Sequence, residues 1–251
     1  MPVRAGVDLE GLHRRARDGA RGSARVSPQG GRRSDWGGIQ FGAGAGTAQR
    51  QADVADGQRR GDDGSELGVG HRAEDRWRQI LQIQSDFAGH SISVSEQITA
   101  SERATNFHNR AIAWLLLTGG YMYCDPMEAC DVYTLQCSTL VTAVDLAVMG
   151  ATLANGGINP VTAKRVIAPA NVSHVLAEMT MEGLYTSSGD WAYTVGLPAK
   201  SGVGGGLVAV SPGKLAIAAY SPPLDQAGNS VRAQAAVTQI AHTLELGLFN
   251  T

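Results

Sequence analysis

Apolar side chains recur every three or four residues through much of the second part of the chain, which is the spacing of one helix face. Five stretches follow this pattern and predict helices: residues 74–88, 106–117, 142–153, 169–181 and 229–246. Glycines follow four of them and supply the expected ends, at Gly89, at Gly119-Gly120, at Asn155-Gly156-Gly157 and at Gly247.

Two further helix starts are predicted from capping residues. The string from Ser93 to Glu96 (Ser-Val-Ser-Glu) has the form of a capping box and predicts a short helix running toward Glu102. Asp125 followed by Pro126 predicts an N-cap and a first-turn proline for a helix running toward Tyr133.

The pattern then changes to short apolar runs separated by turn residues. Residues 191–197, 206–210 and 215–220 are predicted strands, and Ser211-Pro212-Gly213-Lys214 is a predicted hairpin connection between two of them. A block of helices, then strands, then a final helix predicts an α+β fold in which helices flank an antiparallel sheet.

The first 73 residues do not show these patterns of apolar and turn residues. They hold 16 Gly and 12 Arg, no Lys, and only two aromatic residues, Trp36 and Phe41. We therefore divide the chain into an anomalous Gly/Arg-rich segment, residues 1–72, and a folded domain, residues 73–251.

The charge balance points to no polyanionic or membrane partner. The formal net charge is -2 with a pI near 6.3, and the early arginines are mixed with acids and lack aromatic neighbours. The longest apolar run, residues 111–117, is too short to span a bilayer. No apolar stretch of a secretion signal follows Met1. We expect a cytoplasmic protein that binds neither nucleic acid nor membrane.

Three cysteines, Cys124, Cys130 and Cys137, lie close together in the sequence. Their odd number and the absence of a Cys-x-x-Cys pair argue against a disulfide framework and a zinc site. We expect buried, reduced thiols, and no metal or other cofactor.

Four strings carry the most specific information, in a fixed order along the chain: residues 101–111, 123–128, 131–134 and 200–206. Together they resemble the bacterial serine-dependent glutaminases, and the resemblance runs from about residue 74 to 248. It implies a β-lactamase-like (penicillin-binding-protein-like) fold, hydrolysis of L-glutamine to L-glutamate and ammonia through an acyl-serine intermediate, and a homo-oligomer.

The resemblance also implies a set of site residues. It places substrate binding at Glu102, Asn109, Tyr133, Tyr185 and Val203, and catalytic roles at Tyr133 and Lys200. The chemistry is reasonable, because a carboxylate such as Glu102 binds an ammonium by a charge-assisted hydrogen bond. A phenol such as Tyr133 can relay a proton if basic neighbours lower its pKa.

Two of the expected roles depend on local backbone structure. Asn109 follows Glu102 by seven residues, so the two would face one pocket if the helix is continuous. Val203 is expected on a strand, where a backbone N–H could stabilise an oxyanion beside the positive charge of Lys200.

Taken singly, each of these residues has a simpler structural interpretation. Glu102 beside Arg103 is typical of an exposed helix face, and Asn109 of a surface amide. Tyr133 and Tyr185 are typical of half-buried core residues, and residues 202–206 of a bend. The ordered set of motifs favours the site over these alternatives.

The nucleophile is missing from this set. The one literal Ser-x-x-Lys string, Ser211 to Lys214, contains Pro and Gly and is a predicted turn, whereas the family's motif carries its nucleophile on a helix. Codons for residues 7–13 can spell Ser-Ile-Ser-Lys-Val-Phe when read one base later, and the same offset yields family strings from residues 39–42 and 56–62. We therefore hypothesise that the first segment is an out-of-frame translation and that this chain is inactive; a low-complexity tail is the alternative.

Three other functions remain open at this point. A different acyl-serine hydrolase could use the same scaffold, or the chain could be a non-catalytic amino-acid-binding or oligomerisation module. A nucleic-acid role would require a functional Arg-rich segment.

Overall fold

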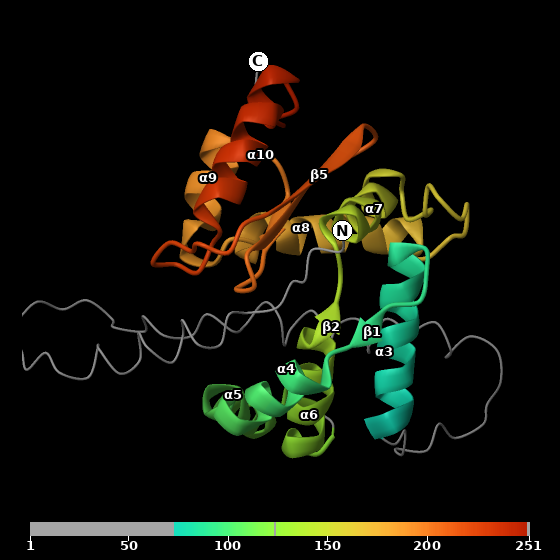
Figure 1. Ribbon diagram of the computed structural model, residues 1–251, viewed down its shortest axis with the longest axis vertical. Coiled ribbons are helices and arrows are strands. Elements are labelled where there is room, and N and C mark those ends of the chain that lie inside the picture. Colours follow the sequence, from blue (N-terminus) through green and yellow to red (C-terminus); the bar gives the residue numbers. More distant parts are fainter. Residues whose placement is uncertain (1–72, 123, 250–251) are drawn as a thin grey trace, which may run out of the picture.

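The structure is a computed structural model, and it describes residues 73–122 and 124–249. A helical part contains α3 (Ala73–Ala88), α4 (Glu96–Thr105), α5 (Phe107–Thr118) and α6 (Pro126–Cys137). Two two-residue strands, β1 (Ser93–Val94) and β2 (Thr139–Leu140), pair antiparallel beside these helices. Figure 1 shows α4, α5 and α6 clustered at one end of the molecule, with α3 running alongside.

A second part is built on a three-stranded antiparallel sheet. Its strands, in the order β3-β4-β5, are β3 (Ala199–Ser201), β4 (Gly206–Ser211) and β5 (Leu215–Tyr220). Its helices are α7 (Ala143–Ala154), α8 (Pro169–Glu182), the 3₁₀ turn η2 (Tyr185–Ser187), α9 (Ser188–Thr194) and α10 (Val231–Thr243).

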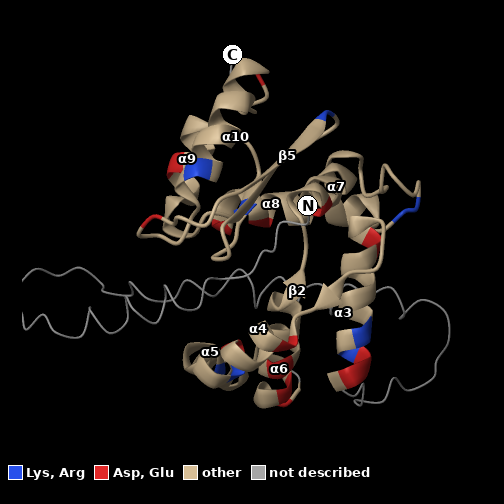
Figure 2. Cartoon of the chain, viewed as in Figure 1, with Lys and Arg blue, Asp and Glu red and all other residues tan. Residues whose placement is uncertain are grey.

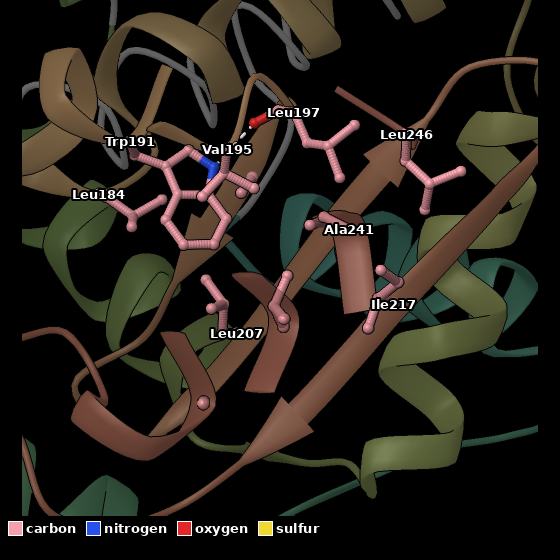
Figure 3. Packing of buried hydrophobic residues seen from close by; sticks show 12 residues of the cluster. Leu184, Trp191, Val195, Leu197, Leu207, Ile217, Ala241 and Leu246 are labelled. Carbon is pink, nitrogen blue, oxygen red and sulfur yellow. Dashed lines mark hydrogen bonds between the residues drawn. The ribbon is translucent and has the colours of Figure 1, made fainter. Parts of the chain in front are cut away.

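The two faces of the sheet are covered by different helices, as the alternation along β4 requires. Leu207 and Ala209 point into a buried cluster that includes Val237 and Ala241 of α10. The intervening Val208 packs in a second cluster together with residues of α7 and α8. The result is a three-layer arrangement of helix, sheet and helix, and the first of these cores is shown in Figure 3.

Close approach of backbones explains two glycines in this part. A Cβ on Gly150 of α7 would lie 2.7 Å from Val208 Cγ2 and 2.8 Å from Ala216 Cβ, so α7 contacts the sheet at a position with no room for a side chain. A Cβ on Gly183, just after α8, would overlap the carbonyl of Ala199 on β3. The sheet is therefore held closely between its helices at both points.

The predicted helices are confirmed, with small differences at their ends. Asp125 caps α6 by accepting hydrogen bonds from the amides of Met127 and Glu128. Thr142 and Asp145 form a capping box at the start of α7. The last helix is shorter than predicted, because Glu245 adopts a positive φ of 51° and the chain turns back to bury Leu246.

The predicted capping box at Ser93 is wrong. Ser93 lies in β1, paired with Leu140, and the N-cap of α4 is Ser95, whose hydroxyl accepts a hydrogen bond from the amide of Ile98. Two serines two residues apart both fit the cap pattern, and strand pairing removes the first.

The predicted strand at residues 191–197 is also wrong, because residues 188–194 form α9. Trp191 and Val195 are buried four residues apart, while Tyr193 between them is 88% exposed. The spacing is therefore helical, although the alternation of large residues resembles a strand. Figure 3 shows Trp191 beside Leu184, with its indole N–H donating to the carbonyl of Leu197 at 2.9 Å.

Helix α3 contacts both parts of the molecule. Near its start, Arg76 forms an ion pair with Glu128 of α6 at 3.0 Å. At its end, the side chain of Asn159 donates to the carbonyls of Asp86 and Phe87, both at 3.0 Å, and Lys164 pairs with Asp86 at 2.7 Å. Figure 1 shows α3 extending from the level of α6 to the level of α7.

Acidic and basic residues both occur on the helices of the described part of the chain. Figure 2 shows basic and acidic residues intermixed on α3, and few charges on the sheet. Within residues 73–122 and 124–249, no helix is long and apolar enough to cross a membrane.

Candidate functional site

Helix α6 places two titratable side chains one turn apart. Tyr133 and Cys137 are separated by four residues and so lie on one helix face, where each affects the pKa of the other. Burial raises the pKa of Tyr133 above its ordinary range, and Cys137, Tyr185 and Glu102 raise it further. Tyr133 is therefore a neutral phenol at neutral pH.

Strand β3 brings a cation to the same place. The ammonium of Lys200 lies 4.7 Å from the centroid of the Tyr185 ring and donates a hydrogen bond to the carbonyl of Ser201. Burial lowers the pKa of Lys200 to about 8, while Cys137 acts in the opposite direction. A lysine in this state can exchange a proton near neutral pH.

Tyr185 occupies an unusual backbone conformation between α8 and α9. Its φ is +55°, in the left-handed region that side chains such as tyrosine rarely adopt. Strain of this kind is kept only where neighbouring contacts fix the residue, and it is concentrated at functional sites. Burial raises the pKa of the phenol, and a hydrogen bond with Ser201 partly offsets the rise.

The turn between β3 and β4 carries Val203 beside Tyr185. A Cβ placed on Gly228 would lie 3.7 Å from both the Tyr185 ring and a Val203 methyl group, so both side chains lie near this glycine. Val203 is 67% exposed and lies in the turn between the strands, not on a strand as the sequence predicted. Its neighbour Ser201 is the last residue of β3.

The structure therefore brings together most of the predicted site residues. Side chains from α4, α6, η2 and β3 interact with one another in a single cluster: Glu102, Tyr133, Tyr185 and Lys200. Val203 lies near Gly228, as the Tyr185 ring does.

Asn109 does not enter these interactions in the described part of the chain. The helix from Glu102 is not continuous, because α4 ends at Thr105 and α5 begins at Phe107. The junction residue Asn106 is buried and donates to Thr134 of α6 at 3.0 Å. Glu102 and Asn109 therefore lie on different helices, and the seven-residue spacing no longer places them on one helix face.

Sequence reasoning missed three residues of the site. Cys137 was expected to be a buried thiol, but the residue is exposed to solvent, whereas Cys130 is buried. Ser201 and Asn229 form a buried hydrogen-bonded pair behind Tyr185. The four-residue interval from Tyr133 could have identified Cys137, but nothing in the sequence pairs residues 201 and 229.

The expected proton relay at Tyr133 required basic neighbours that lower its pKa, and the surroundings instead raise it. Lys200 lies over the ring of Tyr185. Lys200 therefore contacts Tyr185 through its ring and acts electrostatically on Cys137, whose pKa it lowers.

A shallow groove of about 520 Å³ lies elsewhere, between α9 and α10. Its lining includes Asp190, Gln234 and Gln239, and it contains none of the predicted site residues. The candidate site is the side-chain cluster, because four of the residues predicted from the sequence lie there.

The fold and the cluster define the class of this protein. The sheet lies between α7 and α10, and side chains of the helical part lie near β3. This is the β-lactamase-like fold, which is also found in solved structures. A probable glutaminase, ybaS, superposes with a TM-score of 0.73 at 53% identity, covering 83% of this chain and 63% of that one. The Bacillus subtilis glutaminase YbgJ, as a covalent complex with 5-oxo-L-norleucine, gives a TM-score of 0.71 at 29% identity, covering 82% and 68%.

The family model for glutaminase matches residues 65–249, and the chain belongs to the glutaminase family. It is 81% identical over 177 residues to the glutaminase of Mycobacterium marinum (strain ATCC BAA-535 / M), and this match covers 70% of the chain and 55% of the relative. It is 64% identical over 182 residues to the glutaminase of Brucella canis, covering 72% and 57%. The matched part thus spans a little over half the length of these curated relatives.

Proposed function

We propose that residues 73–249 form the glutamine-binding part of a glutaminase, and that this chain binds L-glutamine without hydrolysing it. The convergence of Glu102, Tyr133, Tyr185 and Lys200 from four separate elements carries the proposal. The reaction for which such a site is built is the hydrolysis of L-glutamine to L-glutamate and ammonia. No cofactor is required for it.

Two groups of free glutamine have candidate partners of opposite charge in this cluster. The carboxylate of Glu102 is exposed on α4 and suits the α-ammonium. The ammonium of Lys200 suits an oxygen of the ligand that carries or develops negative charge. Asn109 and Val203 complete the proposed binding set, as the family resemblance implies.

Hydrolysis through an acyl intermediate requires a hydroxyl that can attack the side-chain amide. Ser211 is 3% exposed at the end of β4, paired with Leu215, whereas the turn that carries Val203 precedes the other end of this strand. Ser201 is also 3% exposed, and its hydroxyl is directed at Asn229. Neither serine is placed to act as the nucleophile.

The test is a pair of measurements on the purified chain. Titration calorimetry should show L-glutamine binding that Glu102→Gln weakens, and an ammonia-release assay should show no turnover above the no-protein background. Turnover that survives Ser211→Ala would show that another residue of the chain acts as the nucleophile. The absence of glutamine binding would refute the proposal as a whole.

We also propose that residues 1–72 are translated out of frame, as the shifted reading of residues 7–13 suggests, and that the domain is incomplete for that reason. Sequencing the gene decides this directly. Codons for residues 7–13 that do not spell the serine-lysine motif one base later would exclude a frameshift.

A cytoplasmic location and a homo-oligomeric state belong to the same proposal. Three unpaired thiols are in keeping with a reducing compartment. Sedimentation velocity of the purified chain would establish the oligomeric state.

A further inference from the structure

Strand β5 lies at the edge of the sheet, and among residues 73–122 and 124–249 it pairs only with β4. Ser221, the residue after β5, donates from its N–H to the carbonyl of Gly205 at 2.9 Å, so these two residues form a hydrogen-bonded pair. Hydrogen-bonded and non-hydrogen-bonded pairs alternate along an antiparallel ladder. The main-chain N–H and C=O groups of Ala216, Ala218 and Tyr220 therefore point away from β4, and we call them the outward groups of β5.

The strand at this edge is apolar and has helices over both faces. Ile217 is buried on the α10 side, together with the partly buried Leu215 and Ala219, and Ala216 is partly buried on the α7 side. Residues 215–220 contain no charge, no proline and no bulge, which are the features that keep an edge strand from pairing with another chain. Strand β5 therefore has the surroundings of an interior strand, although the described residues supply a neighbour on one side only.

The sequence of β5 is complementary to a second copy of itself. Two identical antiparallel strands related by a two-fold axis place one residue opposite its own copy, and an axis through Ala218 brings every outward N–H of one strand to a carbonyl of the other. In this register the large side chains also lie opposite small ones. Tyr220 lies opposite the partner's Ala216, and Ile217 lies opposite the partner's Ala219.

The residues that flank β5 favour this register over its neighbours. Pro222 and Pro223 follow the strand and have no N–H, so a shift in their direction loses hydrogen bonds. A shift the other way places the hairpin turn opposite the partner strand, because Gly213 has a φ of +72° and Lys214 donates back to the carbonyl of Ser211 at 3.0 Å. The longest ladder is therefore the one centred on Ala218.

The helices over the sheet leave room for a second copy. A Cβ on Gly150 of α7 would lie 2.7 Å from Val208 of β4 and 2.8 Å from Ala216 of β5, so α7 lies above the space between these two strands. A two-fold axis beside β5 then separates the two α7 helices by two strand spacings, or about 10 Å. Helices pack side by side at about 8–10 Å, so the two copies of α7 can lie next to each other without overlap.

The composition of residues 1–72 disfavours them as the neighbour of β5. No six consecutive residues in this segment are free of glycine, proline and charge, whereas all six residues of β5 are. Glycine, proline and acidic residues are depleted in strands, so the segment is poorly suited to extending the sheet. A second copy of β5 supplies a strand of the required length and character.

We propose that the outer edge of β5 is a dimerisation surface, at which two copies of this chain pair their β5 strands antiparallel and join their sheets into one. The proposal rests on the homo-oligomeric state proposed above and gives it an interface. It does not depend on glutamine binding.

Hydrogen exchange of the full chain, resolved to single amides and measured over a range of protein concentrations, tests this pairing. The N–H groups of Leu215, Ile217 and Ala219 face β4 and should exchange slowly at every concentration. The three outward N–H groups should exchange fast in dilute solution and lose this fast exchange as the dimer fraction from sedimentation velocity rises.

Each other outcome overturns the proposal in a different way. Outward N–H groups that are protected equally at all concentrations would show that another part of the same chain, such as residues 1–72, covers the edge. Outward N–H groups that stay unprotected while the chain self-associates would place the interface elsewhere and leave the homo-oligomeric state standing. A chain that stays monomeric, with these groups unprotected, would refute both.

A pair of substitutions at the centre of the ladder gives an independent test. Ala218→Pro removes an N–H that faces away from β4, so the single chain should tolerate it, which its melting temperature in dilute solution verifies. The dimer would lose one hydrogen bond from each copy, and its dissociation constant should rise about ten-fold or more. Ala218→Ser keeps the N–H at nearly the same size and should leave the dissociation constant unchanged. An equal dissociation constant for the two variants would contradict the proposal.

Discussion

At the scale of single residues, the cluster concentrates groups whose charge is costly to bury. Lys200 has its pKa lowered to about 8 by burial, against an ordinary value of 10.5. The charged form is therefore disfavoured in the folded state, and the ring of Tyr185 compensates only in part.

This shift predicts a pH dependence of stability. Between pH 8 and 10.5 the unfolded chain binds the Lys200 proton and the folded chain does not, so the free energy of unfolding should rise with pH across this range. The rise from this group is at most about 3 kcal/mol. Urea unfolding of the unsubstituted chain and of Lys200→Met, at several pH values, measures it as a difference.

The raised pKa values of Tyr133 and Cys137 make the free energy of unfolding fall as the pH rises. The contribution of Lys200 is therefore measured as the difference between the unsubstituted chain and Lys200→Met, and not from one pH profile. A difference in unfolding free energy that stays flat from pH 8 to 10.5 would show that burial does not lower the pKa of Lys200.

The family resemblance marks Glu102, Tyr133, Tyr185 and Lys200, and the structure places these four within one another's electrostatic reach. Their roles in binding and catalysis remain predictions. The sequence could not show the surroundings of Tyr133, because burial and neighbouring groups from other elements raise its pKa.

At the scale of elements, the helices are predictable because their apolar spacing, caps and glycine ends agree with one another. The prediction of a strand at Trp191 is wrong because large residues recur at every second position there, as in a strand. A seven-residue segment is too short to distinguish this alternation from a helix in which Tyr193 is exposed to solvent. The break between α4 and α5 could not be predicted either, because it depends on Asn106 reaching α6.

The contact of α7 with the sheet predicts that Gly150 tolerates no side chain. Gly150→Ala would place a methyl group against Val208 and Ala216, and overpacking of this kind costs about 1–3 kcal/mol of stability. Gly189→Ala in α9 is the matched control, because a Cβ there has no atom within 4 Å, and alanine stabilises a helix relative to glycine by up to about 1 kcal/mol. Thermal unfolding of the two variants should show opposite signs.

The corrected start of α4 predicts a difference between two serines. Ser95→Ala removes the hydroxyl that caps the helix and should cost about 1 kcal/mol. Ser93→Ala removes an exposed side chain from β1 and should have little effect. Chemical denaturation distinguishes them, and a larger loss from Ser93→Ala would contradict the assignment of Ser95 as the cap.

At the scale of the whole molecule, one titratable contact joins the loop after α3 to the start of α7. His90 Nε2 lies 2.8 Å from Asp145 Oδ1, and this hydrogen bond, together with one to the carbonyl of Ser91, raises the pKa of His90. Burial would raise the pKa of Asp145, but hydrogen bonds from His90 and Thr142 outweigh it and keep that pKa low.

The stabilisation from His90 should be fully present below pH 6.5, its ordinary pKa, and should be lost as the pH rises through the raised value in the folded state. The melting temperature of the unsubstituted chain should therefore fall relative to that of His90→Ala as the pH increases above 6.5. Parallel melting curves across this range would exclude a charged His90–Asp145 pair.

Helix α3 has a consequence for how the protein loses its structure. It is shared by the helical part and the sheet part, through Arg76 at one end and Asp86 at the other. If one part unfolded alone, α3 would lose its contacts with that part, although the other part still requires α3 to be folded. Unfolding should therefore be cooperative across residues 73–249, with a single calorimetric transition whose van't Hoff and calorimetric enthalpies agree.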